Sequence, residues 1–152
     1  MKLKNPLIAV ESIERSVEFY RSVLGLRKTM DLGANVTLTG GLSLQSIETW
    51  KDFIGTDNIV LGANCGEIYF EEDDFDSFAQ RLKGFDIDYV HPVKEHRWGQ
   101  RVVRFYDPDK HIIEVGESLK AVALRFFESG MSKEQVAQRI DIPLTLVNKY
   151  IK

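Results

Sequence analysis

The sequence predicts an α+β protein built from two similar units and a small helical extension. An apolar strand followed by an amphipathic helix occurs twice, and three short strand-like segments follow the helix each time. This recurrence predicts an internal structural repeat, although few residues are identical between the two copies. After Gly116 the pattern becomes helical throughout, which predicts a separate unit at the carboxyl end.

The first unit opens with an apolar segment, 6–10, which we expect to form a short buried strand. A helix follows, because Ser12 is a favourable N-cap and Glu14 lies in the first turn, where the helix dipole favours an acidic residue. Gly25 is a natural stop for this helix. We expect the three strands that complete the unit at 27–31, 35–39 and 42–47, the last two separated by a Gly40-Gly41 turn.

Residues 48–65 show no strand alternation, and we expect them to form a connector with one helical turn. The second unit then begins with a strand at 66–72. The helix after it has acidic residues at its start and Gly84 beyond its end. We expect the three closing strands at 88–93, 100–106 and 111–116. Residues 1–116 are therefore predicted to form one domain.

Residues 117–152 form a second, helical domain in this prediction, with Ser132 as a cap. We expect its helices at 118–128, 132–140 and 144–151. The apolar spacing is that of a helix-turn-helix, but the last segment carries only Lys149 and Lys152 as basic residues. Because so few positive charges are available, we do not expect nucleic-acid binding. Packing or dimerisation fits the tail's apolar residues better.

The composition excludes several classes of protein. The net charge of −3 provides no electrostatic attraction to nucleic acid or to an anionic membrane. Cys65 is the single cysteine, so we expect neither a disulfide framework nor a zinc site built on paired cysteines. No apolar run approaches the length of a membrane span, and the first residues do not read as a signal peptide. We therefore expect a cytoplasmic location and no membrane partner.

Three segments carry a family resemblance: LIAVESIERSVEFYRSVLGL, EIYFEEDDFDSFAQRL and RWGQRVVRFYDPDKHIIEVGE. Together they resemble the vicinal oxygen chelate superfamily, which includes glyoxalase I, bleomycin-resistance proteins and extradiol dioxygenases. The resemblance covers about residues 5–117. It implies two βαβββ modules that form a cup-shaped mixed sheet, a small-molecule substrate or ligand, and a homodimer.

The resemblance also implies a divalent metal in the cup, held by side chains from the first and last strand of each module. Matched residue by residue, these positions fall on Asn5, Gln45, Glu67 and Glu114. An all-oxygen set favours Mg²⁺ or Mn²⁺ over Zn²⁺, and Ni²⁺ is a further candidate. Glu67 stands where a histidine is most usual, and Asn5 is a poor ligand by comparison with histidine, so a site without any metal is an equally open expectation.

Strand alternation gives independent support for grouping the two acidic residues. Side chains two residues apart share one face of a strand, so Glu67 and Tyr69 point the same way. We expect Glu114, on the closing strand, to face the same cavity as Glu67, and we predict both as catalytic residues. The alternative for Glu114 is an ion pair with Arg101, Arg104 or a lysine, or a place at a wet edge of the sheet, because a buried carboxylate is costly without a partner.

Further candidates are the polar and aromatic residues near the cup's rim. We predict substrate contacts for Tyr69, His91, His96, Trp98 and Arg104. The two histidines and Trp98 lie in HPVKEHRWG, a polar segment before a strand, and a solvated loop without substrate contact is the alternative. We expect residues 106–109 to form a tight turn with no further role, and His111 to be structural.

Two functional hypotheses follow. The first is a metal-dependent lyase or isomerase of the lactoylglutathione lyase type, in which a metal stabilises an enolate and Glu114 or Glu67 moves a proton. The second is a metal-free protein that binds or sequesters a small planar molecule. Oxygen chemistry on iron is not expected, because no histidine falls at the matched ligand positions. The sequence favours the lyase by a modest margin.

Overall fold

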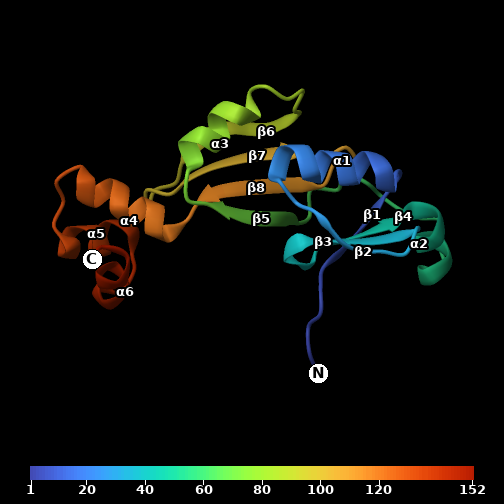
Figure 1. Ribbon diagram of the computed structural model, residues 1–152, viewed down its shortest axis with the longest axis horizontal. Helices are drawn as coiled ribbons and strands as arrows, with labels where there is room; N and C mark the ends of the chain where they lie inside the picture. The colour runs from blue at the N-terminus through green and yellow to red at the C-terminus, as the bar shows by residue number, and fades with distance from the viewer. The chain divides into compact units, whose positions relative to one another are not determined.

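The computed structural model describes residues 1–152 and divides into two units (Figure 1). The first unit comprises Met1–Cys65 with Asp107–His111, and the second comprises Gly66–Tyr106 with Ile112–Lys152. Each unit contains one four-stranded mixed sheet with βαβββ connectivity, and a helical region closes the chain. The predicted α+β class and the two βαβββ modules are thus confirmed.

The sheet of the first unit has the strand order β1-β4-β3-β2, in which β1 and β4 are parallel and the other neighbours are antiparallel. Ser12 caps α1 by accepting a hydrogen bond from the Arg15 N–H, and Gly25 ends the helix with a φ of 71°. Only glycine adopts this left-handed conformation freely. The elements are β1 (Leu7–Val10), α1 (Ile13–Leu24), β2 (Lys28–Asp31), β3 (Asn35–Leu38), η1 (Thr39–Gly41), β4 (Ser43–Ser46) and α2 (Ile47–Ile54).

Helix α2 is longer than the sequence indicated. The expected connector with one helical turn is an eight-residue helix, which ends where Gly55 takes a φ of 70°. The predicted helix was too short, because its apolar residues Ile47, Trp50 and Ile54 recur at helical spacing and not at the spacing of a strand. The Gly40-Gly41 turn is confirmed, with both glycines at positive φ.

Each face of the first sheet has its own character, as alternation requires. One face is apolar and is buried with Tyr20 and Val23 of α1; its strand residues are Val10, Val36, Leu38 and Leu44. The opposite face is polar and carries Asn35, Thr37, Ser43 and Gln45. The core of the first unit therefore lies between the sheet and α1.

Residues 107–111 are more than the simple turn that was expected. The Tyr20 hydroxyl donates to Asp107 at 2.9 Å, and the Ser16 hydroxyl donates to Asp109 at 3.1 Å. Arg15 forms an ion pair with Asp109, and His111 contacts Asp107. Burial raises the pKa of Tyr20, and the negative charge of Asp107 raises it further. The segment is a buried polar anchor within the first unit.

The second sheet repeats the topology of the first, in the order β5-β8-β7-β6 with β5 and β8 parallel. Its apolar face includes the fully buried Val103, Phe105 and Ile113, and α3 lies along the sheet in Figure 1. Pro92 is tolerated because β6 is an edge strand. The elements are β5 (Glu67–Glu72), α3 (Phe75–Leu82), β6 (Tyr89–Glu95), β7 (Arg101–Tyr106) and β8 (Ile112–Glu117).

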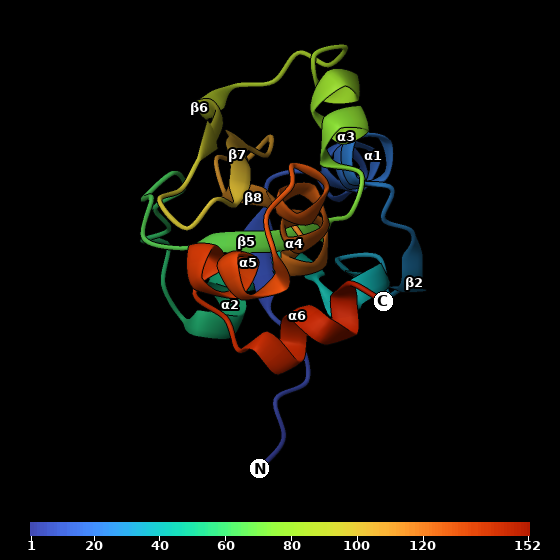
Figure 2. The ribbon, with the colours of Figure 1, turned by 90° about the vertical axis from the view of Figure 1, so that its left-hand side faces the viewer.

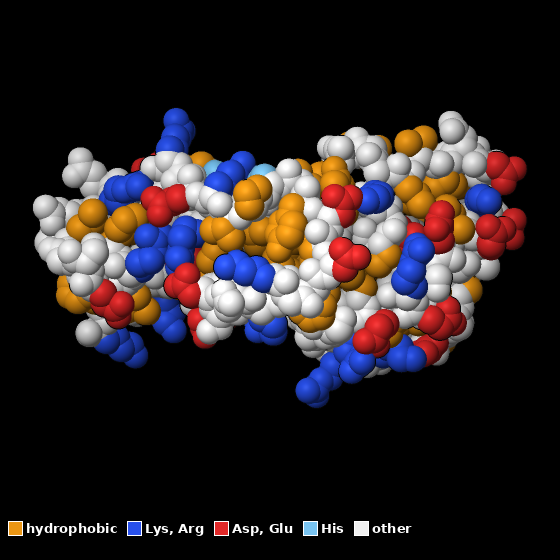
Figure 3. All heavy atoms as spheres, turned by 90° about the horizontal axis from the view of Figure 1, so that it is seen from above, with side chains coloured by type: hydrophobic (Ala, Val, Ile, Leu, Met, Phe, Trp, Pro, Cys, Tyr) orange, Lys and Arg blue, Asp and Glu red, His pale blue; other side chains and the backbone are white.

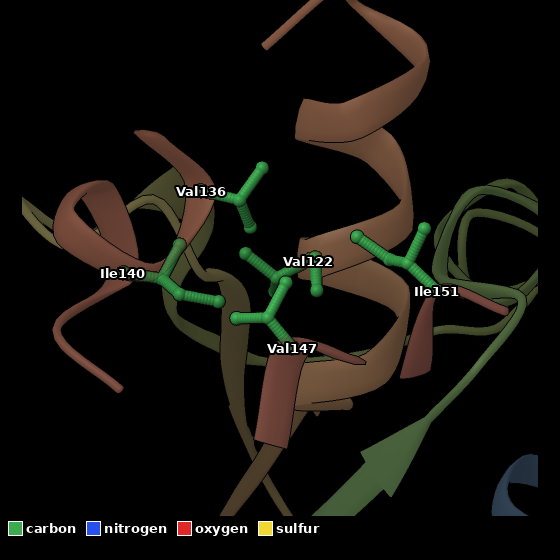
Figure 4. Close-up of a cluster of buried hydrophobic side chains, with 6 residues drawn as sticks. Val122, Val136, Ile140, Val147 and Ile151 are labelled. Atoms are coloured by element: carbon green, nitrogen blue, oxygen red, sulfur yellow. The ribbon is translucent and has the colours of Figure 1, made fainter. Parts of the chain in front are cut away.

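The carboxyl-terminal tail consists of α4 (Leu119–Glu128), α5 (Lys133–Ile140) and α6 (Leu144–Tyr150), close to the three predicted segments. Figure 2 shows the three helices gathered around one another. Their side chains form a separate apolar core (Figure 4), made of Val122, Ala123, Val136, Ile140, Val147 and Ile151. Ser132 and Gln135 form a capping box at the start of α5. No helix combines the length and apolar character needed to cross a bilayer.

Candidate functional site

The polar face of the second sheet carries a row of side chains that crosses all four strands. Tyr69 on β5 pairs with Glu114 on β8, Glu114 pairs with Arg104 on β7, and Arg104 pairs with His91 on β6. Paired residues on neighbouring strands share a face, so the four side chains lie on one side of the sheet. Glu67 shares that side, because it lies two residues before Tyr69.

Arg104 is the centre of this row. Its Nε donates to Oε2 of Glu67 at 2.7 Å and its Nη2 donates to Oε1 of the same residue at 3.4 Å. Nη2 also forms an ion pair with the carboxylate of Glu114, a residue that is only 5 % exposed. A buried carboxylate needs such a partner. One guanidinium therefore neutralises the acidic residue of the closing strand and also reaches the exposed Glu67.

His91 is the third hydrogen-bond partner of the Arg104 guanidinium. Its Nε2 lies 3.2 Å from Nη1 of Arg104, and its Nδ1 lies 2.8 Å from the carbonyl oxygen of Pro92. Because arginine only donates and a carbonyl only accepts, Nε2 must accept and Nδ1 must carry the proton. His91 lies in β6, paired with β7, within the strand expected at 88–93.

An aromatic edge, which we define as His96, Trp98, Gln100 and the ring of Tyr69, adjoins the row. The rings of His96 and Trp98 are stacked, with centroids 4.2 Å apart. Trp98 Nε1 donates to Oε1 of Gln100 at 3.1 Å, and Nε2 of Gln100 donates to the Tyr69 hydroxyl at 3.0 Å. The Tyr69 ring lies over Gly116, where an added Cβ would come within 3.2 Å of the ring. Glycine at this position lets the phenol lie against the sheet.

Two pKa shifts belong to this edge. Partial burial lowers the pKa of His96 below 6.5, and the positive charge of Arg104 lowers it further. His96 is therefore neutral at pH 7. Burial raises the pKa of the Tyr69 hydroxyl, although the hydrogen bond from Gln100 opposes this. At neutral pH both rings are uncharged, which suits stacking rather than ionic contact.

The other two predicted metal ligands lie in the first unit, where protein groups already hold them. The Gln45 Oε1 accepts from Asn35 at 2.8 Å, and its Nε2 donates to the Ala34 carbonyl oxygen and to Thr49. The exposed Asn5 donates to the Ser43 hydroxyl.

The donor set does not fit a metal as it stands. Neither unit groups three or more His, Cys, Asp or Glu side chains as a metal centre would require. Glu67 and Glu114 share Arg104, and the amide oxygen of Gln45 is engaged by Asn35. The metal thus stays a prediction.

The structure brings together all the predicted substrate residues on the second unit: Tyr69, His91, His96, Trp98 and Arg104. Their role in binding stays a prediction. Sequence reasoning missed Gln100 and Gly116. A glutamine beside a strand carries no signal of its own, and its importance comes only from folding beside Tyr69. Gly116 had a usable signal, because a glycine inside a strand often marks a close approach of another group.

Comparison with known proteins identifies the family. A family model described as a glyoxalase-like domain matches residues 3–120. The chain belongs to the glyoxalase-like family. The glyoxalase-like chain is 28 % identical over 129 residues to the uncharacterized protein YraH of Bacillus subtilis strain 168, which matches 78 % of this chain and 100 % of that protein.

Solved structures agree with the fold expected of this family. A protein of unknown function from Agrobacterium tumefaciens C58 is 38 % identical, with a TM-score of 0.71 over 78 % of this glyoxalase-like chain and 94 % of that chain. A lactoylglutathione lyase from Agrobacterium tumefaciens is 22 % identical, with a TM-score of 0.61 over 77 % and 93 % of the two chains. At that identity the likeness shows the fold alone.

The polar face of this glyoxalase-like chain is suited to binding. Its acidic residues Glu67, Glu71 and Glu114 outnumber its basic residues Arg104 and Lys94, as the strand register places them. The face is therefore negative overall. Exposed aromatic rings lie beside these charges.

Proposed function

We propose that this glyoxalase-like protein binds a small, planar, positively charged molecule on the polar face of its second sheet, without a metal. The observation that carries the proposal is Arg104, whose guanidinium contacts both Glu67 and Glu114. The protein thus supplies its own cation at the two carboxylates. A ligand on this face would contact the negative charge that Arg104 does not neutralise and the rings of the aromatic edge.

The exposure of the rings supports a planar ligand. Tyr69 is 45 % exposed and Trp98 is 37 % exposed, so both present ring surface to a molecule from solution. Aromatic faces attract cations and stack on planar rings. Arg104 carries one positive charge against the two carboxylates of Glu67 and Glu114, so one negative charge remains beside the partly exposed Glu67 and favours a cation over a neutral or anionic molecule of the same shape.

Proflavine, a planar aromatic cation, is a suitable probe. We expect it to bind the wild-type protein and to bind the Trp98→Ala and Glu67→Gln variants more weakly, by roughly tenfold each. Naphthalene-1-sulfonate, which is planar but anionic, is the matched control and should bind poorly. Fluorescence titration measures both. Equal binding of the two probes, or unchanged proflavine binding in both variants, would refute the proposal.

A metal-dependent lyase is the second candidate function. It is favoured by the fact that one cationic group already contacts both carboxylates, so a divalent cation that displaced Arg104 would meet two oxygen donors. Mn²⁺, Mg²⁺ and Ni²⁺ affinities of the wild type and of Glu114→Gln provide the test, followed by turnover of a hemithioacetal. If neither protein binds metal at physiological concentrations, this candidate fails and the metal-free proposal stands.

We also propose a homodimer, as the family resemblance implies. Sedimentation velocity over a range of protein concentrations tests this directly. A species of monomer mass at every concentration would contradict it.

A further inference from the structure

The tail contacts the second sheet at its strands and at one short turn. Residues 96–100 connect β6 to β7, and the turn is closed by hydrogen bonds from the Gly99 N–H to the His96 carbonyl and from the His96 N–H to the Gln100 carbonyl. Gly99 has a φ of 91°, a conformation that side-chain-bearing residues rarely adopt. This turn carries Trp98 and Gln100, which belong to the aromatic edge.

Two arginines of the tail bind the backbone of this turn. Nη2 of Arg125, from α4, donates to the Gly99 carbonyl at 2.5 Å. Nη1 of Arg139, from α5, donates to the Arg97 carbonyl at 2.6 Å. Hydrogen bonds from a charged donor are stronger than neutral ones. Because both acceptors are carbonyls, the contacts depend on how the turn is folded and not on its side chains.

Phe126 of α4 lies beside these two arginines. We call Arg125, Phe126 and Arg139 together the bracket. The guanidinium carbons of the two arginines lie 4.7 Å and 5.0 Å from the centre of the Phe126 ring. The ring also lies against Gly99, where an added Cβ would come within 2.4 Å of it. The turn and the bracket are therefore in direct van der Waals contact, with no room for a side chain between them.

Ion pairs hold the bracket in place. Arg125 also donates to Glu117 at 2.8 Å and 3.0 Å, and Arg139 pairs with Glu95. Figure 3 shows basic and acidic side chains intermingled at the end of the second unit where the tail lies. These arginines are thus committed to contacts inside the protein.

We propose that the tail positions the ligand-binding turn, with the bracket fixing residues 96–100 so that Trp98 and Gln100 are held ready for a ligand. This inference rests on the proposed function of the polar face. The glyoxalase-like family match ends at residue 120, so α5 and most of α4 lie outside it. Preorganisation of this kind increases affinity because less freedom is lost on binding.

The test uses full-length protein with Trp50→Phe as background, so that Trp98 is the single tryptophan. In Phe126→Ala and Arg139→Ala we expect Trp98 to become more accessible to acrylamide quenching and the amides of the turn to exchange faster. Proflavine affinity should fall by roughly tenfold in each. Lys149→Ala, an exposed change on the tail, is the matched control and should alter none of these measurements.

Arg139→Lys serves as the conservative variant, because a lysine still donates to the Arg97 carbonyl, and we expect it to restore part of the affinity. Circular dichroism verifies that the tail helices persist in each variant. If the Phe126→Ala variant loses the tail helices, the Arg139→Ala variant alone decides the test, because the Arg139 side chain takes no part in the tail's apolar core.

Unchanged quenching and exchange in Arg139→Ala would overturn the inference. Changed quenching with unchanged proflavine affinity would overturn it too. If proflavine fails to bind even the wild type, the proposed function fails, while the quenching and exchange results still show whether the tail holds the turn.

Discussion

Glu114 shows how one residue is accommodated inside a strand that is otherwise apolar. The strand buries it, and the ion pair with Arg104 offsets the cost of removing the carboxylate from water. Arg104 in turn is held by Glu67 and His91, so its position is set by three neighbours. The same contacts of Arg104 therefore both stabilise the buried carboxylate of Glu114 and order the polar face of the second sheet.

Replacing Arg104 by Met tests this arrangement. Removing one partner of a buried pair typically costs about 3–5 kcal/mol of unfolding free energy, because the other charge is left unpaired. We expect a loss of that order in urea unfolding at pH 7. The double variant Arg104→Met/Glu114→Leu should regain most of it, since no buried charge is left. A double variant no more stable than Arg104→Met would show that Glu114 does not depend on Arg104.

His96 gives a prediction of pH dependence. Its pKa is lowered in the folded protein, so below the ordinary value of 6.5 the unfolded chain binds protons more readily and stability falls as the pH decreases. Protonation of the stacked ring should also quench Trp98. In the Trp50→Phe background we expect fluorescence to change with a midpoint below pH 6.5, and His96→Gln to remove the transition. A midpoint above 6.5 would contradict the lowered pKa.

At the scale of elements, local signals predicted most of the fold. The caps at Ser12 and Ser132 and the stop at Gly25 are interactions within a few residues of chain, and they fix the helix ends without help from distant parts. Strand alternation likewise placed Glu67 and Tyr69 on one face. Such features are visible in a sequence because their physics is local.

What the sequence did not disclose depends on tertiary contacts. Nothing near Gln100 indicates that it will meet Tyr69, thirty-one positions away. Arg104 was one of several available partners for Glu114, and only the register of β7 against β8 selects it. Strand β6 ends at Glu95, two residues beyond the expected end at 93, because an edge strand accepts polar residues and Pro92.

The capping box of α5 provides a prediction at this scale. Ser132 accepts a hydrogen bond from the Gln135 N–H, and the Gln135 side chain accepts one from the Ser132 N–H. We expect Ser132→Ala to reduce the unfolding free energy by about 1 kcal/mol, measured by urea denaturation. Ser132→Asp, which also caps, should retain most of the stability. Equal losses in both variants would show that the cap is not the cause.

At the scale of the whole molecule, acid stability depends on buried carboxylates such as Glu117. This residue is 1 % exposed and accepts hydrogen bonds from Arg101 and Arg125. Burial acts to raise its pKa, but the two arginines outweigh it and hold the pKa below 4.5. Glu117 therefore stabilises the protein above its ordinary pKa, and this contribution is lost as the pH falls.

Glu117→Gln checks this contribution. We expect the variant to unfold at lower urea concentration than the wild type at pH 7, because two arginines lose their carboxylate. The difference should shrink as the pH falls below 4.5, because the carboxyl takes up a proton in the unfolded chain first and in the folded protein only at lower pH. A difference independent of pH would show that the charge of Glu117 is not what stabilises the fold.

The anchor formed by residues 107–111 has a consequence for the order of synthesis. The hydroxyls of Tyr20 and Ser16 are made early, but the carboxylates that accept their hydrogen bonds belong to residues 107 and 109. A nascent chain that has reached Cys65 holds the whole first sheet and still lacks these acceptors. The first module therefore stays incompletely bonded at α1 until most of the second has emerged from the ribosome.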